Sequence, residues 1–283
     1  MFTVSCFLFL GLALIVTAKE KKPIVQEKKS CCSTEQFASL TTDKSFRNAH
    51  LEPVAMNFIP TTGTWITLKT TDGTEAKAFE VKADKPTGNV IFMIHEWWGL
   101  NEYIQREAEQ LQQSLPNVTV IALDLYDGKI AKDRETAGKY MGQVVKARSE
   151  TIIRAAINYV GQNAKIGTIG WCFGGGWSLQ ATLLAGKQAE ACVIYYGMPE
   201  TDVVKLKTLH ADVLGIFGKQ DQWINPKVVA AFENNMKQAG KKLTVKSYDA
   251  DHAFANPSNP QFDKVATEDA KKIAVEFFKV RLK

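Results

Sequence analysis

Short, continuous runs of apolar residues recur along this chain and restrict its fold more than any other feature. They cover residues 90–94, 118–123, 166–169 and 213–217. Such runs are typical of strands buried on both faces of a parallel sheet. Between them, apolar residues over 104–115 repeat at helical spacing, and Asn225-Pro226 marks a helix start that Gly240 would end. This alternation predicts an α/β domain with a doubly wound, mostly parallel sheet.

The first part of this sheet is expected to be a hairpin. Residues 65–68 and 76–81 flank the turn sequence Thr71-Asp72-Gly73, which predicts two antiparallel strands leading into the sheet. Helices are expected between 133 and 160, and a closing amphipathic helix over 265–282. Residues 46–283 are long enough for a single domain with one large core. No insertion is long enough for a large lid domain.

The sequence Gly170-Trp171-Cys172-Phe173-Gly174 is typical of a nucleophile elbow that carries cysteine. A strand that turns abruptly into a helix strains its turning residue, and side chains at the flanks would collide with neighbouring backbone. Cys172 would project from such a turn. The free N–H groups of the helix start would favour its thiolate and could hold an oxyanion. A glycine-flanked cysteine buried in the core is the simpler alternative.

Three further polar residues, Glu96, Asp221 and His252, each follow a predicted strand. Because reactive groups gather beyond the carboxyl ends of parallel strands, we expect all of them to lie with Cys172 at one edge of the sheet. Asp221 competes with the aspartates at 212, 249 and 251, and could also be a solvated turn residue. Glu96 could be a strand-end carboxylate that only caps a helix.

Position separates the four histidines. His252 alone satisfies the chain order nucleophile, acid, histidine of the hydrolase fold. His50 lies in the N-terminal approach to the domain, His210 precedes its strand, and His95 precedes the nucleophile. His252 is therefore the expected general base.

From about residue 65 to the C-terminus, the chain resembles the dienelactone hydrolases, cysteine members of the α/β-hydrolase fold. The resemblance is carried by the segments Ile94-His95-Glu96-Trp97-Trp98-Gly99-Leu100, Asp124-Leu125-Tyr126, Gly170-Trp171-Cys172-Phe173-Gly174-Gly175, Gly218-Lys219-Gln220-Asp221 and His252-Ala253-Phe254-Ala255. Together these motifs are fairly specific, whereas each alone is not.

The resemblance implies a role for each site residue and no cofactor. Cys172 would be the nucleophile, His252 the general base and acid, and Asp221 the group that orients the imidazole. Glu96 would contact the thiol in the resting enzyme and move away from it when substrate binds. The backbone N–H groups of Phe173 and Trp97 would form the oxyanion hole.

One departure from the family concerns the substrate. Members that cleave dienelactones usually carry an arginine shortly after Asp-Leu-Tyr and another four residues after the histidine, where they hold the substrate carboxylate. Here Asp127 or Gly128 and Asn256 occupy these places, and neither an amide nor a glycine replaces a bidentate guanidinium. The tryptophans around the site segments suggest an alternative: if two of them face the cleft, the acyl or alcohol portion of the substrate should be apolar or ring-shaped. The residues expected to bind it are Trp98, Tyr126, Trp171, Trp223, Phe254 and Asn256.

Metal, nucleotide and nucleic-acid sites are not expected. His95-Glu96 begins like a zinc-protease motif but lacks the second histidine, and Gly174-Gly175-Gly176 lacks the Gly-Lys-Ser/Thr ending of a phosphate loop. The chain carries a formal charge of +5. Five lysines and two glutamates between 19 and 29 supply three of these charges. The remaining domain is close to neutral, which argues against a nucleic-acid surface.

The N-terminus predicts export to the periplasm or the medium. Residues 1–18 form an uncharged apolar stretch that ends Val16-Thr17-Ala18, as in a cleaved signal peptide. A retained membrane anchor is the alternative, and only it would bring membrane contact. Residues 19–45 are expected to form a flexible tether. Adjacent Cys31 and Cys32 could form a strained or intermolecular disulfide or stay free, whereas Cys192 is expected in a buried strand.

These observations favour an exported enzyme that hydrolyses a small ester or lactone through a Cys-His-Asp triad and a covalent acyl-enzyme. A thioesterase or a peptidase-like acyl hydrolase on the same fold is the first alternative. A catalytically inactive α/β-hydrolase domain used for binding is the second. The sequence does not indicate the oligomeric state.

Overall fold

The computed structural model describes residues 1–2, 33–259 and 261–283. In this part of the chain, an eight-stranded sheet has the order β1-β2-β4-β3-β5-β6-β7-β8. The strands are β1 (Thr64–Lys69), β2 (Glu75–Val81), β3 (Asn89–Ile94), β4 (Thr119–Leu123), β5 (Lys165–Trp171), β6 (Ala189–Tyr195), β7 (Asp212–Gly218) and β8 (Leu243–Tyr248). β2 is antiparallel to β1 and β4, and all other neighbours are parallel. The predicted mostly parallel sheet with its N-terminal hairpin is confirmed.

The central strands are buried along their whole length, as their continuous apolar runs predict. Every residue of β3 is buried, and β5 is buried from Ile166 to Trp171. The edge hairpin differs, because most residues of β1 are exposed or half-buried. Cys192 lies buried in β6, as expected.

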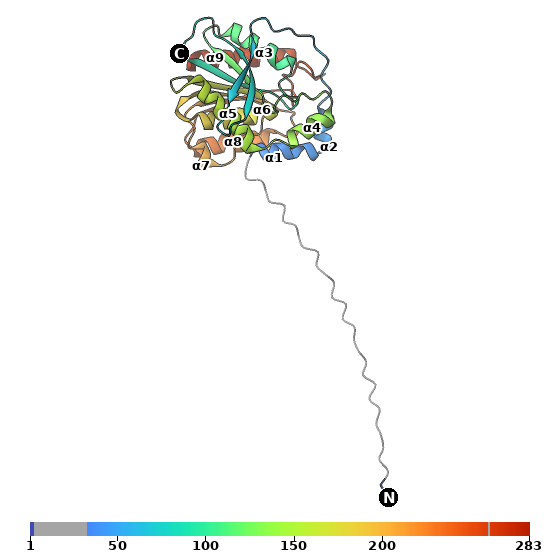
Figure 1. Cartoon of the computed structure of the whole chain (residues 1–283). Coiled ribbons are helices and arrows are strands. Elements are labelled where there is room, and N and C mark those ends of the chain that lie inside the picture. Colours follow the sequence, from blue (N-terminus) through green and yellow to red (C-terminus); the bar gives the residue numbers. More distant parts are fainter. Residues whose placement is uncertain (3–32, 260) are drawn as a thin grey trace.

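Helices cover both faces of the sheet (Figure 1). They are α3 (Glu102–Ser114), α4 (Arg134–Gly142), α5 (Lys146–Val160), α6 (Phe173–Ala185), α7 (Val203–Leu206), α8 (Pro226–Gln238) and α9 (Lys264–Arg281), with 3-10 turns η1 (Leu40–Thr42) and η2 (Gly186–Gln188). α3 and α9 share one face, where Lys271 pairs with Glu107 at 2.6 Å, and α5 packs against α6 on the other. Asn225 caps α8 at the predicted start. The described residues contain no large lid domain.

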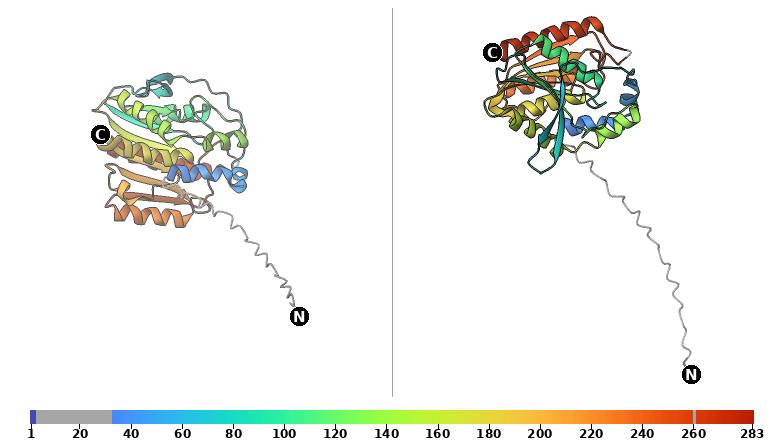
Figure 2. Two further views of the ribbon diagram at one scale, coloured as in Figure 1. Left: turned by 60° about the horizontal axis from the view of Figure 1, so that its bottom comes forward. Right: turned by 45° about the horizontal axis from the view of Figure 1, so that its top comes forward.

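The predicted tether over residues 19–45 is wrong in its last part. Two helices, α1 (Ser33–Ser39) and α2 (Lys44–Ala49), pack against the domain beside α4 and α6. Figure 2 shows them in blue along one side of the molecule. Phe37 and Phe46 are buried and meet edge to face at 5.7 Å. Two isolated aromatic anchors thus hold a segment that has too little periodicity to reveal a helix. Residues 19–32 lie outside the described residues.

The carboxyl ends of the strands gather the predicted site residues. Glu96 follows β3, Cys172 follows β5, Asp221 follows β7 and His252 follows β8. Because these strands run parallel, all four residues reach the same edge of the sheet, as expected. Among the described helices, none is long and apolar enough to span a bilayer.

Candidate active site

Cys172 sits on a strained turn between β5 and α6. Its φ of 55° and ψ of −118° are unusual for any residue with a side chain. A Cβ added to Gly170 would lie 2.1 Å from the carbonyl oxygen of Gly174, and one added to Gly174 would lie 2.3 Å from that of Ile94. The two glycines therefore allow the tight strand-to-helix turn that the sequence predicts.

His252 and Asp221 are in line with the thiol. Nε2 of His252 lies 3.4 Å from Sγ of Cys172, and Nδ1 lies 2.6 Å from Oδ2 of Asp221. Oδ1 of Asp221 accepts hydrogen bonds from the backbone N–H groups of Trp223 and Ile224, both at 2.8 Å. The structure thus brings together the three side chains that the sequence selected. His95 serves elsewhere, because its Nε2 accepts from the backbone N–H of Leu125 at 3.2 Å.

Burial and charge set the protonation of this group. Burial raises the pKa of the Cys172 thiol, an effect that His252 and the backbone N–H of Phe173 oppose. Burial alone would lower the pKa of His252, but the Asp221 carboxylate and Cys172 raise it well above its ordinary value. Burial likewise opposes ionisation of Asp221, yet His252 and the two backbone N–H groups lower its pKa overall. A proton leaving the sulfur therefore has a strongly basic acceptor within reach.

Glu96 does not make the contact expected of it. Among the described residues, no hydrogen bond joins it to the Cys172 thiol. Instead Oε1 accepts from the hydroxyl of Tyr196 at 3.2 Å, and Oε2 accepts from the side-chain amide of Asn256. Burial raises the pKa of Glu96 to about 7, although these partners and His252 favour the carboxylate. The tertiary fold supplies partners that satisfy this carboxylate away from the sulfur.

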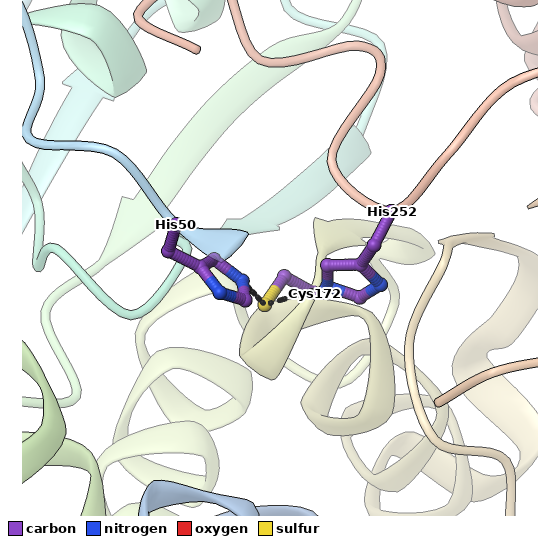
Figure 3. A group of neighbouring side chains, drawn as sticks. All are labelled: His50, Cys172 and His252. Carbon is purple, nitrogen blue, oxygen red and sulfur yellow. Dashed lines mark hydrogen bonds between the residues drawn. The ribbon is translucent and has the colours of Figure 1, made fainter. Parts of the chain in front are cut away.

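His50 is the site residue that the sequence did not reveal. Its Nε2 lies 3.9 Å from Sγ of Cys172, and its ring lies 5.2 Å from that of His252, so both histidines border the sulfur (Figure 3). Its Nδ1 donates to the carbonyl oxygen of Phe46 at 2.7 Å, because a carbonyl can only accept. The only signal in the sequence is Phe46, one helical turn earlier, which could anchor this segment. No metal site was expected, yet ligand atoms of His50, Cys172 and His252 lie within 4.8 Å of one another, close enough to hold an ion.

The six expected substrate-binding residues do not share one cavity. Trp98, Trp171 and Asn256 line a small hollow that is partly open to solvent, with Glu96 at its wall. Trp223 lies elsewhere, with its ring 5.7 Å from that of His252. The sequence could not separate these positions, because all of them follow strand ends.

The other two expected substrate-binding residues lie apart from this hollow. Tyr126 borders a different hollow beside Tyr140 and Arg148. Phe254 is fully buried and packs on Tyr196 and Tyr248, at 5.5 Å and 5.3 Å between ring centroids, so it belongs to the core. Its aromatic character reflects packing against other rings rather than an exposed binding face.

Two backbone N–H groups were expected to form an oxyanion hole. Phe173 begins α6, and its N–H faces the Cys172 sulfur closely enough to lower the thiol pKa. Trp97 lies in the turn after β3, with a fully buried side chain whose indole nitrogen has no hydrogen-bond partner among the described residues. The start of α6 therefore lies beside the sulfur, which is where an acyl oxyanion would form.

A parallel sheet of this topology, with a strained elbow cysteine and a His-Asp pair, defines an α/β-hydrolase fold with a thiol at its nucleophile position. Residues 76–282 match the model of the dienelactone hydrolase family. The chain belongs to this family, whose members hydrolyse esters and lactones, and the predicted family resemblance is confirmed.

Individual relatives agree with this assignment. The chain is 27% identical to "Protein usf" of Aquifex pyrophilus over 206 residues, which cover 68% of this chain and 88% of the relative. It is 23% identical to "Carboxymethylenebutenolidase 1" of Cupriavidus pinatubonensis, covering 68% and 87%. The crystal structure of a dienelactone hydrolase from Anabaena variabilis has a TM-score of 0.57 at 20% identity, covering 79% of this chain and 100% of that one. At this identity, the structural likeness shows the fold alone.

Proposed function

We propose that this hydrolase cleaves small ester or lactone bonds through a covalent thioester on Cys172. The single observation that carries the proposal is the alignment of Asp221, His252 and Cys172, with contacts of 2.6 Å and 3.4 Å. In the first step, His252 Nε2 takes the thiol proton while Sγ attacks the carbonyl carbon. The C–O bond of the substrate then breaks, and the leaving alkoxide takes that proton back from His252.

The second half of the reaction uses the same groups. Water attacks the thioester carbon, its proton passes to His252, and the C–S bond breaks to return the thiol. With a lactone substrate, the leaving alcohol stays attached to the acyl chain, so ring opening gives one hydroxy acid. The Asp221 carboxylate keeps the proton on Nδ1 and stabilises the imidazolium that forms twice in each turnover. The N–H groups of Phe173 and Trp97 are proposed to hold the oxyanion.

Glu96 is proposed to control how readily the thiol ionises. Its negative charge raises the thiol pKa, although by less than burial does. His252 has the opposite effect and lowers this pKa. Because the pKa of Glu96 is about 7, its own protonation would relieve this effect near neutral pH. The hydrogen bond from Asn256 holds the carboxylate in the wall of the hollow rather than on the sulfur.

The lining of the hollow favours a neutral substrate of small size. Its side chains include two indole rings, from Trp98 and Trp171, and Asn256 in a place where dienelactone-cleaving relatives usually have arginine. Lys271 also borders the hollow, but it is paired with Glu107 at 2.6 Å, which offsets its charge toward an anion. A carboxylate on the substrate would therefore find little compensation.

Export is proposed from the apolar segment at 2–18 alone. That segment, apart from Phe2, and the candidate cleavage position after Ala18 lie outside the described residues. N-terminal sequencing of the protein recovered from the producing cells checks the proposal. A mature chain beginning at Lys19 supports a cleaved signal peptide, whereas a chain that still carries residues 2–18 in the membrane fraction supports the anchor.

The mechanism is tested with the full chain and p-nitrophenyl acetate as a small neutral ester. We expect intact-mass spectrometry after rapid quenching to show one acetyl group on Cys172. The Cys172→Ala variant should lose both this adduct and turnover, while Cys172→Ser keeps weak activity at best. Cys192→Ala, which changes a buried cysteine of β6, is the matched control and should retain activity.

Two results would contradict the mechanism. Unchanged turnover in Cys172→Ala would exclude the thiol as nucleophile. An acetyl group found on another residue, and lost when that residue is changed, would show that this residue is the nucleophile and not Cys172. Comparison of a neutral lactone with an anionic one and with a thioester then ranks the substrate classes by kcat/KM.

A further inference from the structure

Two histidines border the Cys172 sulfur with their rings 5.2 Å apart, which exceeds what the triad requires. His252 comes from the loop after β8, and His50 comes from the C-terminal end of α2, 122 residues before Cys172 in the chain. The Nε2 atoms lie 3.4 Å and 3.9 Å from Sγ. In Figure 3 both ring edges face the sulfur. The proposed chemistry uses only His252, so the position of His50 needs another explanation.

The outer hydrogen bonds determine which atoms carry protons. Nδ1 of His50 donates to Phe46 and Nδ1 of His252 donates to Asp221, so neither Nδ1 is free to bind anything else. Nε2 of His50 therefore presents a lone pair to the sulfur. Sγ of Cys172 and Nε2 of His252 share one proton between them. Three electron-pair donors thus converge on one point with a single proton among them.

The spacing suits a metal ion better than a hydrogen bond from the thiol to His50. Zinc binds thiolate sulfur at about 2.3 Å and imidazole nitrogen at about 2.0 Å, so a tetrahedral ion places sulfur and nitrogen about 3.5 Å apart. The observed separations of 3.4 Å and 3.9 Å bracket this value, and all three donor atoms lie within 4.8 Å of one another. Side-chain rotations that bring the two nitrogen atoms closer would complete the geometry.

The surroundings supply the second shell that such sites require. A carboxylate behind one histidine and a backbone carbonyl behind the other are the partners that commonly orient zinc-binding imidazoles. The ring of His50 is also fixed between Phe46 and Trp97, each at 4.4 Å between centroids. Cys172 is only 1% exposed and His50 only 5% exposed, so the candidate ligands are shielded from bulk solvent.

We propose that His50, Cys172 and His252 form a binding site for Zn²⁺, which holds the hydrolase inactive while it is bound. The ion binds the thiolate and both Nε2 atoms, and the single shared proton is released to solvent. A solvent molecule takes the fourth position. Bound zinc occupies the sulfur electron pair that would attack a carbonyl. The binding does not depend on the proposed function, whereas the loss of activity does.

The site is tested with Co²⁺ as a spectroscopic substitute for Zn²⁺, in a chain whose Cys6, Cys31 and Cys32 are replaced by serine. These three cysteines lie outside the described residues and could bind metal themselves. We expect one equivalent of Co²⁺ to give a thiolate-to-cobalt charge-transfer band that one equivalent of Zn²⁺ abolishes. Because the site is buried, each titration point is read after equilibration.

Variants assign the ligands. Cys172→Ser should lose the charge-transfer band. His50→Gln should weaken Zn²⁺ binding at least tenfold, since loss of an outer-shell partner alone typically costs about 10–100-fold. His210→Gln changes an exposed histidine and should bind zinc like the parent chain. Circular dichroism confirms that each variant is folded. If His50→Gln does not fold, the proposal is tested by Cys172→Ser alone. A charge-transfer band that persists in Cys172→Ser would overturn the proposal.

Hydrolysis of p-nitrophenyl acetate provides a second measurement. Zinc should inhibit the parent chain reversibly, with activity restored by a chelator, and inhibition of His50→Gln should need at least tenfold more zinc. Equal zinc affinity in the parent and in folded His50→Gln would overturn the site. Absence of the band in an active enzyme would refute the metal site alone, whereas a band in a chain without esterase activity would refute the proposed function alone.

Discussion

The carboxylate of Asp221 contacts the imidazole of His252 through one oxygen and the backbone through the other. Oδ2 lies 2.6 Å from Nδ1, and Oδ1 accepts from the N–H groups of Trp223 and Ile224. The backbone N–H groups therefore fix the Asp221 carboxylate, which in turn fixes the orientation of the imidazole ring. This arrangement keeps Nε2 directed at Cys172, 3.4 Å away.

Replacing Asp221 with asparagine should disable catalysis without unfolding the chain. The amide is almost isosteric, but its NH₂ group can turn toward Nδ1 and stabilise the wrong tautomer. We expect kcat for an aryl ester to fall about 1,000-fold or more, the size of effect seen when a triad histidine loses its carboxylate. Asp249→Asn, which changes an exposed carboxylate that accepts from Gln220, is the control. A decrease of less than tenfold in Asp221→Asn would show that His252 does not depend on this partner.

Stability should depend on pH through Glu96. Its pKa rises from 4.5 to about 7 on folding because the side chain is buried. The unfolded chain therefore releases this proton near pH 4.5, whereas the folded chain keeps it until about pH 7. The contribution of Glu96 to stability is complete below pH 4.5 and is lost as pH rises to about 7. This loss lowers the free energy of unfolding by about 3 kcal/mol.

Urea unfolding across this window isolates the effect when Glu96→Gln is compared with the parent chain. Glutamine can accept from Asn256 and donate to the Tyr196 hydroxyl, so it keeps both contacts without a charge. The free energy of the variant relative to the parent should improve as pH rises from 4.5 to 7. Glu268→Gln removes an exposed carboxylate and should leave the pH profile unchanged. Parallel profiles for Glu96→Gln and the parent would contradict the raised pKa.

The elbow should not tolerate a side chain at Gly170. The added Cβ of Gly170→Ala would lie 2.1 Å from a backbone oxygen, which cannot move without displacing the start of α6. We expect a loss of several kcal/mol in unfolding free energy, or no folded protein. Gly73→Ala adds a methyl group in open space at φ +80° and should cost only about 1 kcal/mol. Similar melting temperatures for the two variants would refute the close approach.

The N-terminal helices should protect the thiol. Phe46 is fully buried in α2, and its ring lies 5.2 Å from Trp223 and 6.0 Å from His252. Phe46→Ala removes this anchor at a cost of about 3–5 kcal/mol, so α2 should separate more often from the site. Iodoacetamide should then alkylate Cys172 at least severalfold faster, as followed by mass spectrometry. Val204→Ala, at an exposed position, should not change the rate. An unchanged rate in Phe46→Ala would show that the thiol is reached by another route.

Local patterns in the sequence were sufficient for the sheet and the triad. Runs such as 90–94 are continuous because both faces of their strands are buried. Of the glycines around Cys172, Gly170 is required by a backbone contact four residues away, and Gly174 by the end of the neighbouring parallel strand β3. Once parallel strands are predicted, Asp221 and His252 must reach the edge that Cys172 reaches. Family membership follows from the same short motifs. These features depend on neighbours in the chain or on the direction of strands, which the pattern reveals.

Only the tertiary structure decided what surrounds the thiol. His50 and Cys172 meet because Phe37 and Phe46 bury themselves against the domain, and two aromatic residues in a polar segment leave no periodic signal. Likewise, Glu96 contacts Tyr196 and Asn256 instead of the sulfur, a choice among partners 100 and 160 residues away. Contacts of this kind depend on how side chains fill space after the strands are assembled. The sequence alone therefore determined which residues reach the edge of the sheet, and packing decided which of them touch.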